Sequence, residues 1–426
     1  MFLFDLPNHY CEMSEEKVVG KKRSRKKLGG CYHCGAQHKA KHCPNVVCRL
    51  CGILGHDAGG CTKKAKRPVD MGTWTSTKDN SIGFTFIELF AGVGGFRIAL
   101  DKLGGHCVFA SEIDRFCVKN YESNFGGDRP AGNICEISSD KIPPADLLVG
   151  GFPCQPFSSS GSMKGLDDPR GQLFREIVRL LQDLKPKGFI LENVRGLLLH
   201  NNGETLKVIL KELEKNDYKV KYKVIDAAKI LPQERSRLYF VGVRSDLYRD
   251  EEYQFPNIPS LNRGVEDILH RPEEIETIKH LALNSNQLNK VKSQKYTKEF
   301  PEARFLSDLK VPAKTIQSSY SKYMVGSQFV PMDGEWRRFS HREVARLQGF
   351  PESFSLCKDR AYHMIGNAVA PPLIAIIAAS LLQYTNIISD QRERLGWDIA
   401  TSMLMDACPE DRKKVLQEAF EKIKTN

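Results

Sequence analysis

The sequence lacks a secretory signal and any long apolar run. Its first four residues are apolar (MFLF), but Asp5 and Pro7 follow too soon for a signal peptide. Because no apolar run approaches the length of a membrane span, we expect no membrane partner. In a chain without a secretory signal we expect a reducing compartment, where the 13 cysteines serve as thiols or metal ligands.

The full G-x-G-x-x-G pattern of dinucleotide-binding sites is also missing. Residues 86–90 (FIELF) predict a short buried strand, and the glycine-rich turn 91–96 (AGVGGF) precedes a helical pattern. A second strand over residues 107–111 ends at Glu112, where a carboxylate is well placed to bind a ribose. By itself this pattern indicates a cofactor site only weakly, because a tight turn in any α/β protein has the same composition.

One cysteine stands in a tight Gly/Pro turn. Residues 150–158 (GGFPCQPFS) directly follow the apolar strand 145–149, so Cys154 is expected at the carboxyl edge of a sheet. A partly exposed thiol in such a turn suits a nucleophile. The alternative is a buried structural cysteine, since free cysteine is among the most buried residue types.

Further polar residues follow two predicted strands. Glu192 lies at the end of the apolar segment 188–194, and Arg235 and Arg237 come just before the apolar segment 238–243. Taken alone, Glu192 also fits a structural role as an ion-paired or helix-capping acid. The arginines alone also fit a solvated surface.

Six segments together resemble the motifs of cytosine-C5 DNA methyltransferases, in the order of that family. They are residues 86–96 (FIELFAGVGGF), 150–158 (GGFPCQPFS), 192–194 (ENV), 233–237 (QERSR), 342–351 (REVARLQGFP) and 366–369 (GNAV). The resemblance covers residues 84–385 and is closest to compact bacterial-type enzymes. The long regulatory amino-terminal region of large maintenance enzymes is absent from the sequence.

The resemblance implies a covalent mechanism on a cytosine of double-stranded DNA. Cys154 attacks C6, Glu192 hydrogen-bonds or protonates N3, Arg237 holds O2, and Arg235 supports the site. The methyl group comes from S-adenosylmethionine, and the base that removes the C5 proton is not identified. The target cytosine has to be flipped out of the duplex, and residues 159–171 are implied to form a mobile lid over it, with an ordinary connecting loop as the alternative.

The same resemblance assigns a set of residues to the cofactor. They are Phe90, Ala91, Gly92, Gly94, Gly95, Phe96, Glu112, Ile113, Asn133, Ile134, Pro153, Leu173, Asn367, Ala368 and Val369. The glycine-rich turn is implied to lie against the methionine part, Glu112 against the ribose and Ile113 against adenine. Asn133 departs from the family, which has Asp here, so the contact to the adenine amino group would come from an amide oxygen.

Two Cys/His groups near the amino terminus have the spacing of zinc knuckles. The predicted ligands of two tetrahedral zinc ions are Cys31, Cys34, His38, Cys43, Cys48, Cys51, His56 and Cys61. The first group is one residue short before His38, so His33 and His42 compete as ligands, and a disulfide framework is the alternative. Such knuckles usually bind single-stranded nucleic acid, often RNA, and some bind proteins.

Positive charge is concentrated near the amino terminus. Residues 1–80 contain 15 lysines and arginines and 7 acids, which gives this segment +8 of the formal net charge of +11. The basic runs 21–27 (KKRSRKK) and 63–67 (KKAKR) indicate nuclear import or a phosphate-binding arm, and we expect a nuclear location. The alternative is a solvated disordered tail.

The expected fold class is α/β, a Rossmann-like S-adenosylmethionine-dependent methyltransferase fold with a smaller target-recognition domain. We expect a basic disordered tail (1–30), the two zinc knuckles (31–61), a linker (62–84), a catalytic domain (85–245), a target-recognition domain (246–357), a return to the catalytic domain (358–389) and a helical tail (390–426). The catalytic unit is expected to be a monomer.

Two other functions are alternatives to DNA methylation. A tRNA or RNA cytosine-C5 methyltransferase shares the fold and the chemistry, and zinc knuckles suit RNA. That branch carries a Cys-Phe-Thr element where this chain has Thr315-Ile316-Gln317, which favours DNA. A non-catalytic nucleic-acid-binding relative is disfavoured because Cys154, Glu192, Arg235 and Arg237 are all present.

Overall fold

The computed structural model describes residues 71–72, 83–152, 172–323, 326–390, 392 and 394–425. All eight predicted zinc ligands lie outside these residues. The same holds for Pro153, Cys154 and the predicted lid 159–171.

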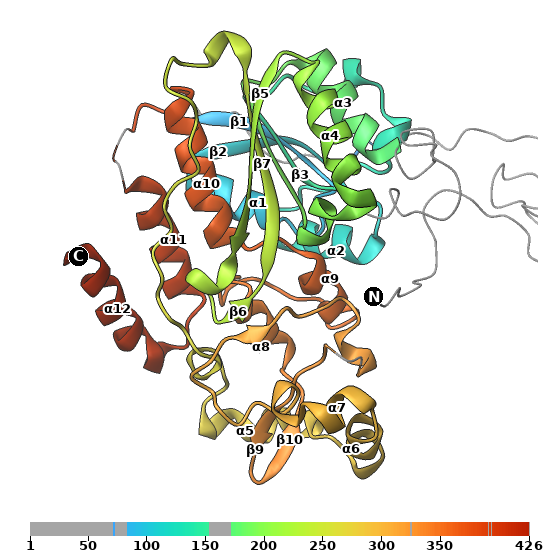
Figure 1. Cartoon of the computed structure of the whole chain (residues 1–426), viewed down its shortest axis with the longest axis vertical. Helices are drawn as coiled ribbons and strands as arrows, with labels where there is room; N and C mark the ends of the chain where they lie inside the picture. Colours follow the sequence, from blue (N-terminus) through green and yellow to red (C-terminus); the bar gives the residue numbers. More distant parts are fainter. Residues whose placement is uncertain are drawn as a thin grey trace, which may run out of the picture. The chain divides into compact units, whose positions relative to one another are not determined.

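A six-stranded mixed sheet lies at the centre of the described part (Figure 1). Its strands, in spatial order, are β2 (Gly105–Ser111), β1 (Phe84–Leu89), β3 (Leu147–Gly151), β4 (Gly188–Val194), β7 (Ser236–Arg244) and β5 (Tyr218–Asp226). The first four are parallel, and β7 runs antiparallel to both β4 and β5. The predicted α/β class is confirmed, and every strand expected from an apolar run is present.

The sequence explains the positions of these strands. The inner strands β3 (LLVGG) and β4 (GFILENV) are almost continuously apolar, as expected of parallel strands covered on both faces. The strand β5 (YKVKYKVID) places lysines at alternate positions and forms an edge of the sheet. Charged side chains on an edge strand disfavour pairing with another chain.

Helices cover both faces of the sheet. They are α1 (Gly95–Lys102), α2 (Arg115–Asn124), α3 (Gln172–Leu184), α4 (Glu204–Glu214) and α10 (Pro371–Tyr384). On one face, Leu147, Val149 and Ile190 share a core with α1 and α10. On the other, the Phe152 ring packs against the Phe174 ring of α3 in a tilted arrangement, with ring centroids 5.6 Å apart.

The stretch Ala361–Tyr384 is long and apolar enough to cross a membrane. The expectation that no apolar run approaches that length is therefore wrong. However, 89% of its most apolar window is buried inside the protein, because α10 packs against the sheet. A core helix passes the same test of length and composition.

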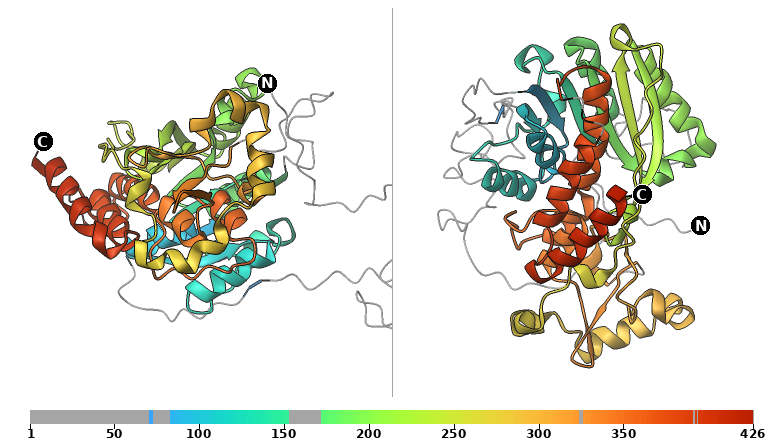
Figure 2. Two further views of the ribbon diagram at one scale, coloured as in Figure 1. Left: turned by 90° about the horizontal axis from the view of Figure 1, so that it is seen from below. Right: turned by 90° about the vertical axis from the view of Figure 1, so that its left-hand side faces the viewer.

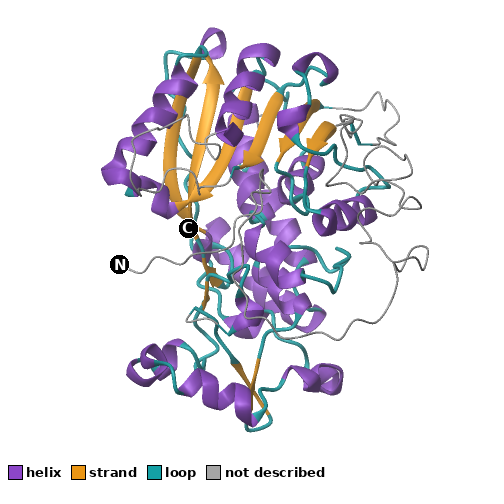
Figure 3. Ribbon diagram, turned by 90° about the vertical axis from the view of Figure 1, so that its right-hand side faces the viewer, coloured by secondary structure: helices purple, strands orange, loops and turns teal. Residues whose placement is uncertain are grey.

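The segment that follows β7 in the sequence and precedes α10 forms most of a smaller part (Figure 1). Figure 3 shows this part, at the lower end of the view, as helices and loops with a pair of short strands. Its helices are α5 (Ile275–Ile278), α6 (Ser285–Lys292), α7 (Lys295–Glu299), α8 (His341–Leu347) and α9 (Ala361–Asn367). Two short sheets pair β6 (Gln233–Glu234) with β8 (Ala313–Lys314) and β9 (Val330–Met332) with β10 (Glu335–Arg337). Buried Ile316, Tyr320 and Phe339 join this part to the main core.

Two helices follow α10 at the carboxyl end, α11 (Leu395–Asp406) and α12 (Lys413–Thr425) (Figure 2). Gly396 permits a close approach of α11 to α10, because a Cβ there would lie 2.9 Å from Ile376 Cα. Leu416 and Phe420 of α12 are buried. The Phe420 ring meets Trp397 of α11 edge-on.

Candidate active site

Glu192 and Arg237 meet at the carboxyl edge of the sheet. Glu192 pairs with Gly151 at the end of the parallel strand β3 and with Tyr239 of the antiparallel strand β7. Arg237, two residues before Tyr239, places its Nε 3.1 Å from Glu192 Oε1. The structure thus brings together two of the four predicted catalytic residues.

The Glu192 carboxyl is buried in this position. Burial raises its pKa above the ordinary value, and the guanidinium groups of Arg237 and Arg235 act in the opposite direction. A carboxyl group with a raised pKa keeps its proton closer to neutral pH. Glu192 is therefore suited to donate a hydrogen bond or a proton to a ligand beside Arg237.

Arg235 points toward the chain that follows α9. Its Nη2 donates to the carbonyl oxygens of Gly366 (3.1 Å) and Ala368 (2.7 Å). Burial and the nearby Arg237 lower its pKa. Its Nε and Nη1 have no hydrogen-bond partner among the described residues. Arg235 thus holds the turn 366–368 through two hydrogen bonds.

A chain of buried amides completes this support and was not identified from the sequence. Gln233 Oε1 accepts from the Ile316 backbone (2.9 Å), and Gln233 Nε2 donates to Gln348 Oε1 (2.8 Å). Gln348 Nε2 in turn donates to the Ala368 carbonyl oxygen. Both glutamines stand in motifs that carry the family resemblance, but composition does not reveal that they bond to each other.

The glycine-rich turn after β1 has an unusual backbone. Phe90, Gly92 and Gly94 all have positive φ values, of 54°, 54° and 84°. A Cβ on Gly94 would collide with the Phe125 ring, and one on Gly95 would lie 2.8 Å from Val369 Cγ2. The close packing at Gly95 brings the first and the last motif of the predicted cofactor site into contact.

Glu112 stabilises the turn from the end of β2. Its Oε2 accepts from the Gly92 backbone (2.7 Å), and its Oε1 accepts from the backbones of Ile113 (2.8 Å) and Asp114 (2.7 Å). Burial raises the pKa of Glu112, and the three N–H groups oppose that rise. The carboxylate retains lone pairs for a further donor such as a ribose hydroxyl. The Ile113 side chain, 49% exposed, offers an apolar surface beside it.

The other residues predicted to bind the cofactor lie in different environments. Ala91, Phe96, Ile134, Ala368 and Val369 are buried, Leu173 is partly buried at the start of α3, and Asn367 is exposed. The Asn133 amide caps a short 3-10 helix, with Oδ1 accepting from Cys135 N (3.2 Å), so the oxygen assigned to the adenine amino group already has a donor. The open turn, the acid of Glu112 and the exposed Ile113 together fit a cofactor that carries a nucleoside.

A buried polar cluster lies next to the glycine-rich turn. The cluster was not predicted from the sequence. Tyr121 Oη donates to Glu88 Oε2 (3.1 Å), and the Arg97 backbone donates to Glu88 Oε1 (3.4 Å). Arg97 Nη2 forms an ion pair with Asp128 (2.6 Å). Burial raises the pKa of Glu88 to about 8. The cluster connects β1, α1 and α2 on both sides of the turn.

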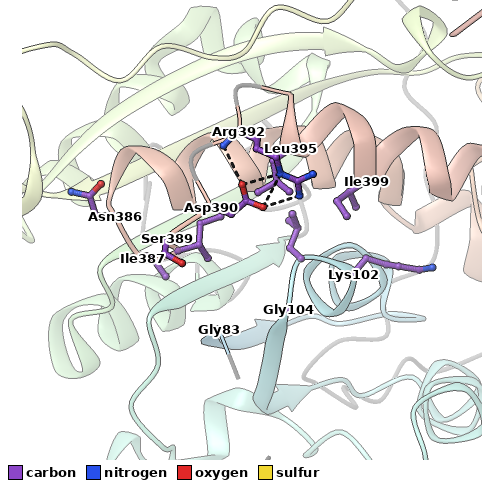
Figure 4. A pocket seen from close by; sticks show the side chains of 12 residues that line it. Gly83, Lys102, Gly104, Asn386, Ile387, Ser389, Asp390, Arg392, Leu395 and Ile399 are labelled. Carbon is purple, nitrogen blue, oxygen red and sulfur yellow. Dashed lines mark hydrogen bonds and ion pairs between the residues drawn. The ribbon is translucent and has the colours of Figure 1, made fainter. Parts of the chain in front are cut away.

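Within the described ranges, no group of three or more His, Cys, Asp or Glu side chains could hold a metal ion. A pocket of about 790 Å³ lies beside Gly83 and Gly104, at the amino ends of the parallel strands (Figure 4). It is remote from Glu192, and Asp390 neutralises its Arg392.

Comparison with known proteins identifies the family. The sequence profile described as C-5 cytosine-specific DNA methylase matches residues 84–383. The chain belongs to this family. Among curated relatives, the type II methyltransferase M.DsaV of Dactylococcopsis salina is 40% identical over 314 residues, covering 72% of this chain and 88% of the relative. M.HhaI of Haemophilus parahaemolyticus is 35% identical over 322 residues, covering 71% and 96%.

Solved structures agree on the fold. The S. pombe Dnmt2 methyltransferase superposes with a TM-score of 0.56 at 20% identity, covering 71% of this chain and 99% of that chain. A Spodoptera frugiperda DNMT2 variant gives a TM-score of 0.54 at 19% identity, covering 71% and 99%. The α/β methyltransferase fold with a mixed sheet is confirmed, and the chain is a DNA cytosine-C5 methyltransferase that uses S-adenosylmethionine.

Proposed function

We propose that Cys154, Glu192 and Arg237 methylate C5 of a cytosine flipped out of duplex DNA. The observation that carries this proposal is the Glu192–Arg237 ion pair of 3.1 Å, formed next to Gly151 at the end of β3. A buried acid and a guanidinium side by side match the N3 and O2 edge of cytosine, which accepts hydrogen bonds at both atoms.

Chain length supports Cys154 as the third member. The last described residue before it is Phe152, whose carbonyl oxygen accepts from Asn193 Nδ2 at 3.0 Å. Two residues of extended chain span at most about 7 Å. Since Asn193 is the neighbour of Glu192, the Cys154 thiol is within reach of a base held by Glu192 and Arg237.

The chemistry assigns one task to each residue. The Cys154 thiolate forms a bond to C6, and Glu192 donates a hydrogen bond or a proton to N3, where negative charge develops as the ring accepts the electron pair of the thiolate. This makes C5 nucleophilic, and S-adenosylmethionine supplies the methyl group when bound. Removal of the C5 proton by a base then expels Cys154 and restores aromaticity. Arg237 keeps the ring oriented at O2 throughout.

Base flipping is required because the reacting groups lie at a sheet edge. A stacked cytosine does not reach a thiol there, and unstacking costs about a few kcal/mol. We assign closure over the flipped base to residues 159–171, which lie outside the described part of the chain. This segment directly follows Cys154 and combines glycine with polar residues.

The amino-terminal region is assigned from sequence alone. We propose that the two Cys/His groups of residues 31–61 bind two zinc ions. We further propose that residues 31–61 bind single-stranded nucleic acid or RNA. These residues lie before the family match, which begins at residue 84. The nuclear location and the monomeric state stay predictions, and the bacterial relatives give the nuclear location no support.

Methyl transfer from labelled cofactor to two substrates tests the proposed function. With duplex DNA and total tRNA offered separately, label is expected in the duplex, at C5 of cytosine. Duplexes already carrying 5-methylcytosine at the modified positions should accept none. Label only in tRNA would show that the site acts on RNA, and label on the cytosine N4 amine would refute the thiolate mechanism.

A further inference from the structure

Two buried side chains hold the carbonyl oxygen of Ala368. Arg235 Nη2 donates to it at 2.7 Å, and Gln348 Nε2 donates to it at 2.5 Å. A carbonyl oxygen has two lone pairs, so these two donors saturate it. Because a peptide unit is planar, they also fix the orientation of the peptide that follows Ala368. This peptide belongs to the turn 367–369, which we call the cofactor turn and which packs against Gly95, where the first and last motifs of the predicted cofactor site meet.

The Gln348 amide is oriented in turn by Gln233. Gln233 Nε2 donates to Gln348 Oε1 at 2.8 Å, and Gln233 Oε1 accepts from the Ile316 N–H at 2.9 Å. A backbone N–H only donates and a carbonyl only accepts, so the two ends of this series determine how both glutamine amides are turned. We call Ile316, Gln233, Gln348 and Ala368 the amide relay. Every hydrogen bond in the amide relay runs in one direction, from the Ile316 N–H to the Ala368 carbonyl oxygen.

The amide relay connects the smaller part to the cofactor turn. It begins at Ile316, shortly after β8, and passes through Gln233 of β6 and Gln348 at the end of α8. Figure 1 shows β6 and α8 between the six-stranded sheet and the helices α6 and α7. These three residues are buried, with exposed fractions of 3%, 0% and 1%. Water therefore does not compete for these hydrogen bonds, and a displacement of one member reaches the next.

We propose that Gln348 is a positioning residue for S-adenosylmethionine, an assignment that rests on the proposed function. By holding the Ala368 carbonyl oxygen, Gln348 keeps the cofactor turn in the shape that binds the methionine part of the cofactor. It acts through Ala368 and does not touch the cofactor, because its amide is buried and bonded at both ends within the protein. Through Gln233, it also makes cofactor affinity depend on the segment 313–316 of the smaller part.

Gln348→Met tests this role, because it removes the amide with little change in side-chain volume. Gln233 Nε2 keeps the Leu347 carbonyl oxygen as an acceptor at 3.2 Å, and the Ala368 carbonyl oxygen keeps Arg235 as a donor. Both partners of the lost amide thus retain a hydrogen bond, so we expect the variant to fold. Its melting temperature without cofactor checks that expectation.

Gln383→Met, near the end of α10, is the matched control. The Gln383 amide also donates to main-chain carbonyl oxygens, those of Asp390 (3.1 Å) and Arg392 (2.8 Å). Asp390 and Arg392 line the pocket at the amino ends of the parallel strands, away from the cofactor turn. The control therefore removes an amide of the same chemistry and leaves the amide relay intact.

Isothermal titration with S-adenosylmethionine in the absence of DNA measures cofactor affinity. Loss of one buried hydrogen bond should weaken binding about three- to tenfold in Gln348→Met, with less than about a twofold change in Gln383→Met. In methylation assays the KM for the cofactor should rise by the same factor, while kcat at saturating cofactor stays within about twofold, since Gln348 takes no part in the chemical step. Equal cofactor affinities in Gln348→Met and the unaltered protein, or a loss confined to kcat, would overturn the positioning role.

Amide hydrogen exchange at Ile316 tests the connection to the smaller part. Because binding free energies are reciprocal, a cofactor that orders the cofactor turn should also protect the Ile316 N–H at the other end of the amide relay. S-adenosylmethionine should slow exchange there in the unaltered protein and in Gln383→Met, but not in Gln348→Met. Exchange that the cofactor leaves unchanged in the unaltered protein, or slows equally in Gln348→Met, would contradict the proposal. An unaltered protein that binds no S-adenosylmethionine would instead refute the proposed function.

Discussion

Arg237 Nε lies 3.1 Å from Glu192 Oε1, which joins two antiparallel strands by an ion pair at the reacting edge of the sheet. The pair is separate from the acid predicted to bind the cofactor, because Glu112 directly follows β2 and has its own backbone donors. Substitutions at the two acids should therefore affect different kinetic constants.

Glu192→Gln should lower kcat about 10²–10⁴-fold, because the amide does not transfer a proton to N3. The cofactor dissociation constant should change less than threefold. Single-turnover methylation and isothermal titration with cofactor check the two values. Comparable losses in both would indicate that Glu192 mainly holds the fold.

Arg237→Gln should move the pH dependence of kcat as well as lowering kcat. The Arg237 charge lowers the pKa of Glu192, so its removal lets burial raise that pKa further. If Glu192 works in its protonated form, the alkaline limb of the profile shifts to higher pH. A shift to lower pH would contradict this role, and exposed Arg392→Gln serves as the control.

Glu88→Gln tests the buried cluster behind the glycine-rich turn. Burial raises the pKa of Glu88 from 4.5 to about 8, so its contribution to stability is complete below pH 4.5 and is lost as the pH rises through 8. The amide does not ionise. The unfolding free energy of the variant should thus fall less steeply between pH 5 and 8, by about 1 kcal/mol per pH unit. Denaturant unfolding at several pH values gives this free energy for the variant and for the unaltered protein. If the two free energies changed with pH by the same amount, Glu88 would not titrate in that range.

Deletion of residues 1–70 tests the modular role of the amino-terminal region. The segment contains 14 lysines and arginines and 6 acids, so it carries eight net positive charges. Turnover on a short saturating duplex should stay near normal, while the concentration of DNA needed rises and its salt dependence flattens. Metal analysis should show two zinc ions lost, and Cys51→Ser should release about one. Failure at saturating DNA with normal cofactor binding would place the segment in the active architecture.

Local signals in the sequence predicted the strands and several site residues. The apolar runs before Glu112 and Glu192 are visible as strands because buried parallel strands are almost wholly apolar. The shared edge of Glu192 and Arg237 came from the family resemblance, since 45 residues separate the two. Gln233 and Gln348 are 115 apart in sequence, and Glu88 and Tyr121 are 33 apart. Nothing local to these residues indicates such pairs, because buried polar groups find their partners only in the packed fold.

Covalent capture tests the nucleophile most directly. A duplex with 5-fluorocytosine at the target blocks removal of the C5 substituent, so the Cys154–C6 bond persists after methyl transfer. The intact protein and Cys135→Ser, which alters an exposed thiol, should each form a denaturant-resistant complex with this duplex in the presence of cofactor. Cys154→Ser should form none while still binding the duplex. A covalent complex in Cys154→Ser, or its absence from the intact protein that methylates ordinary DNA, would contradict the account.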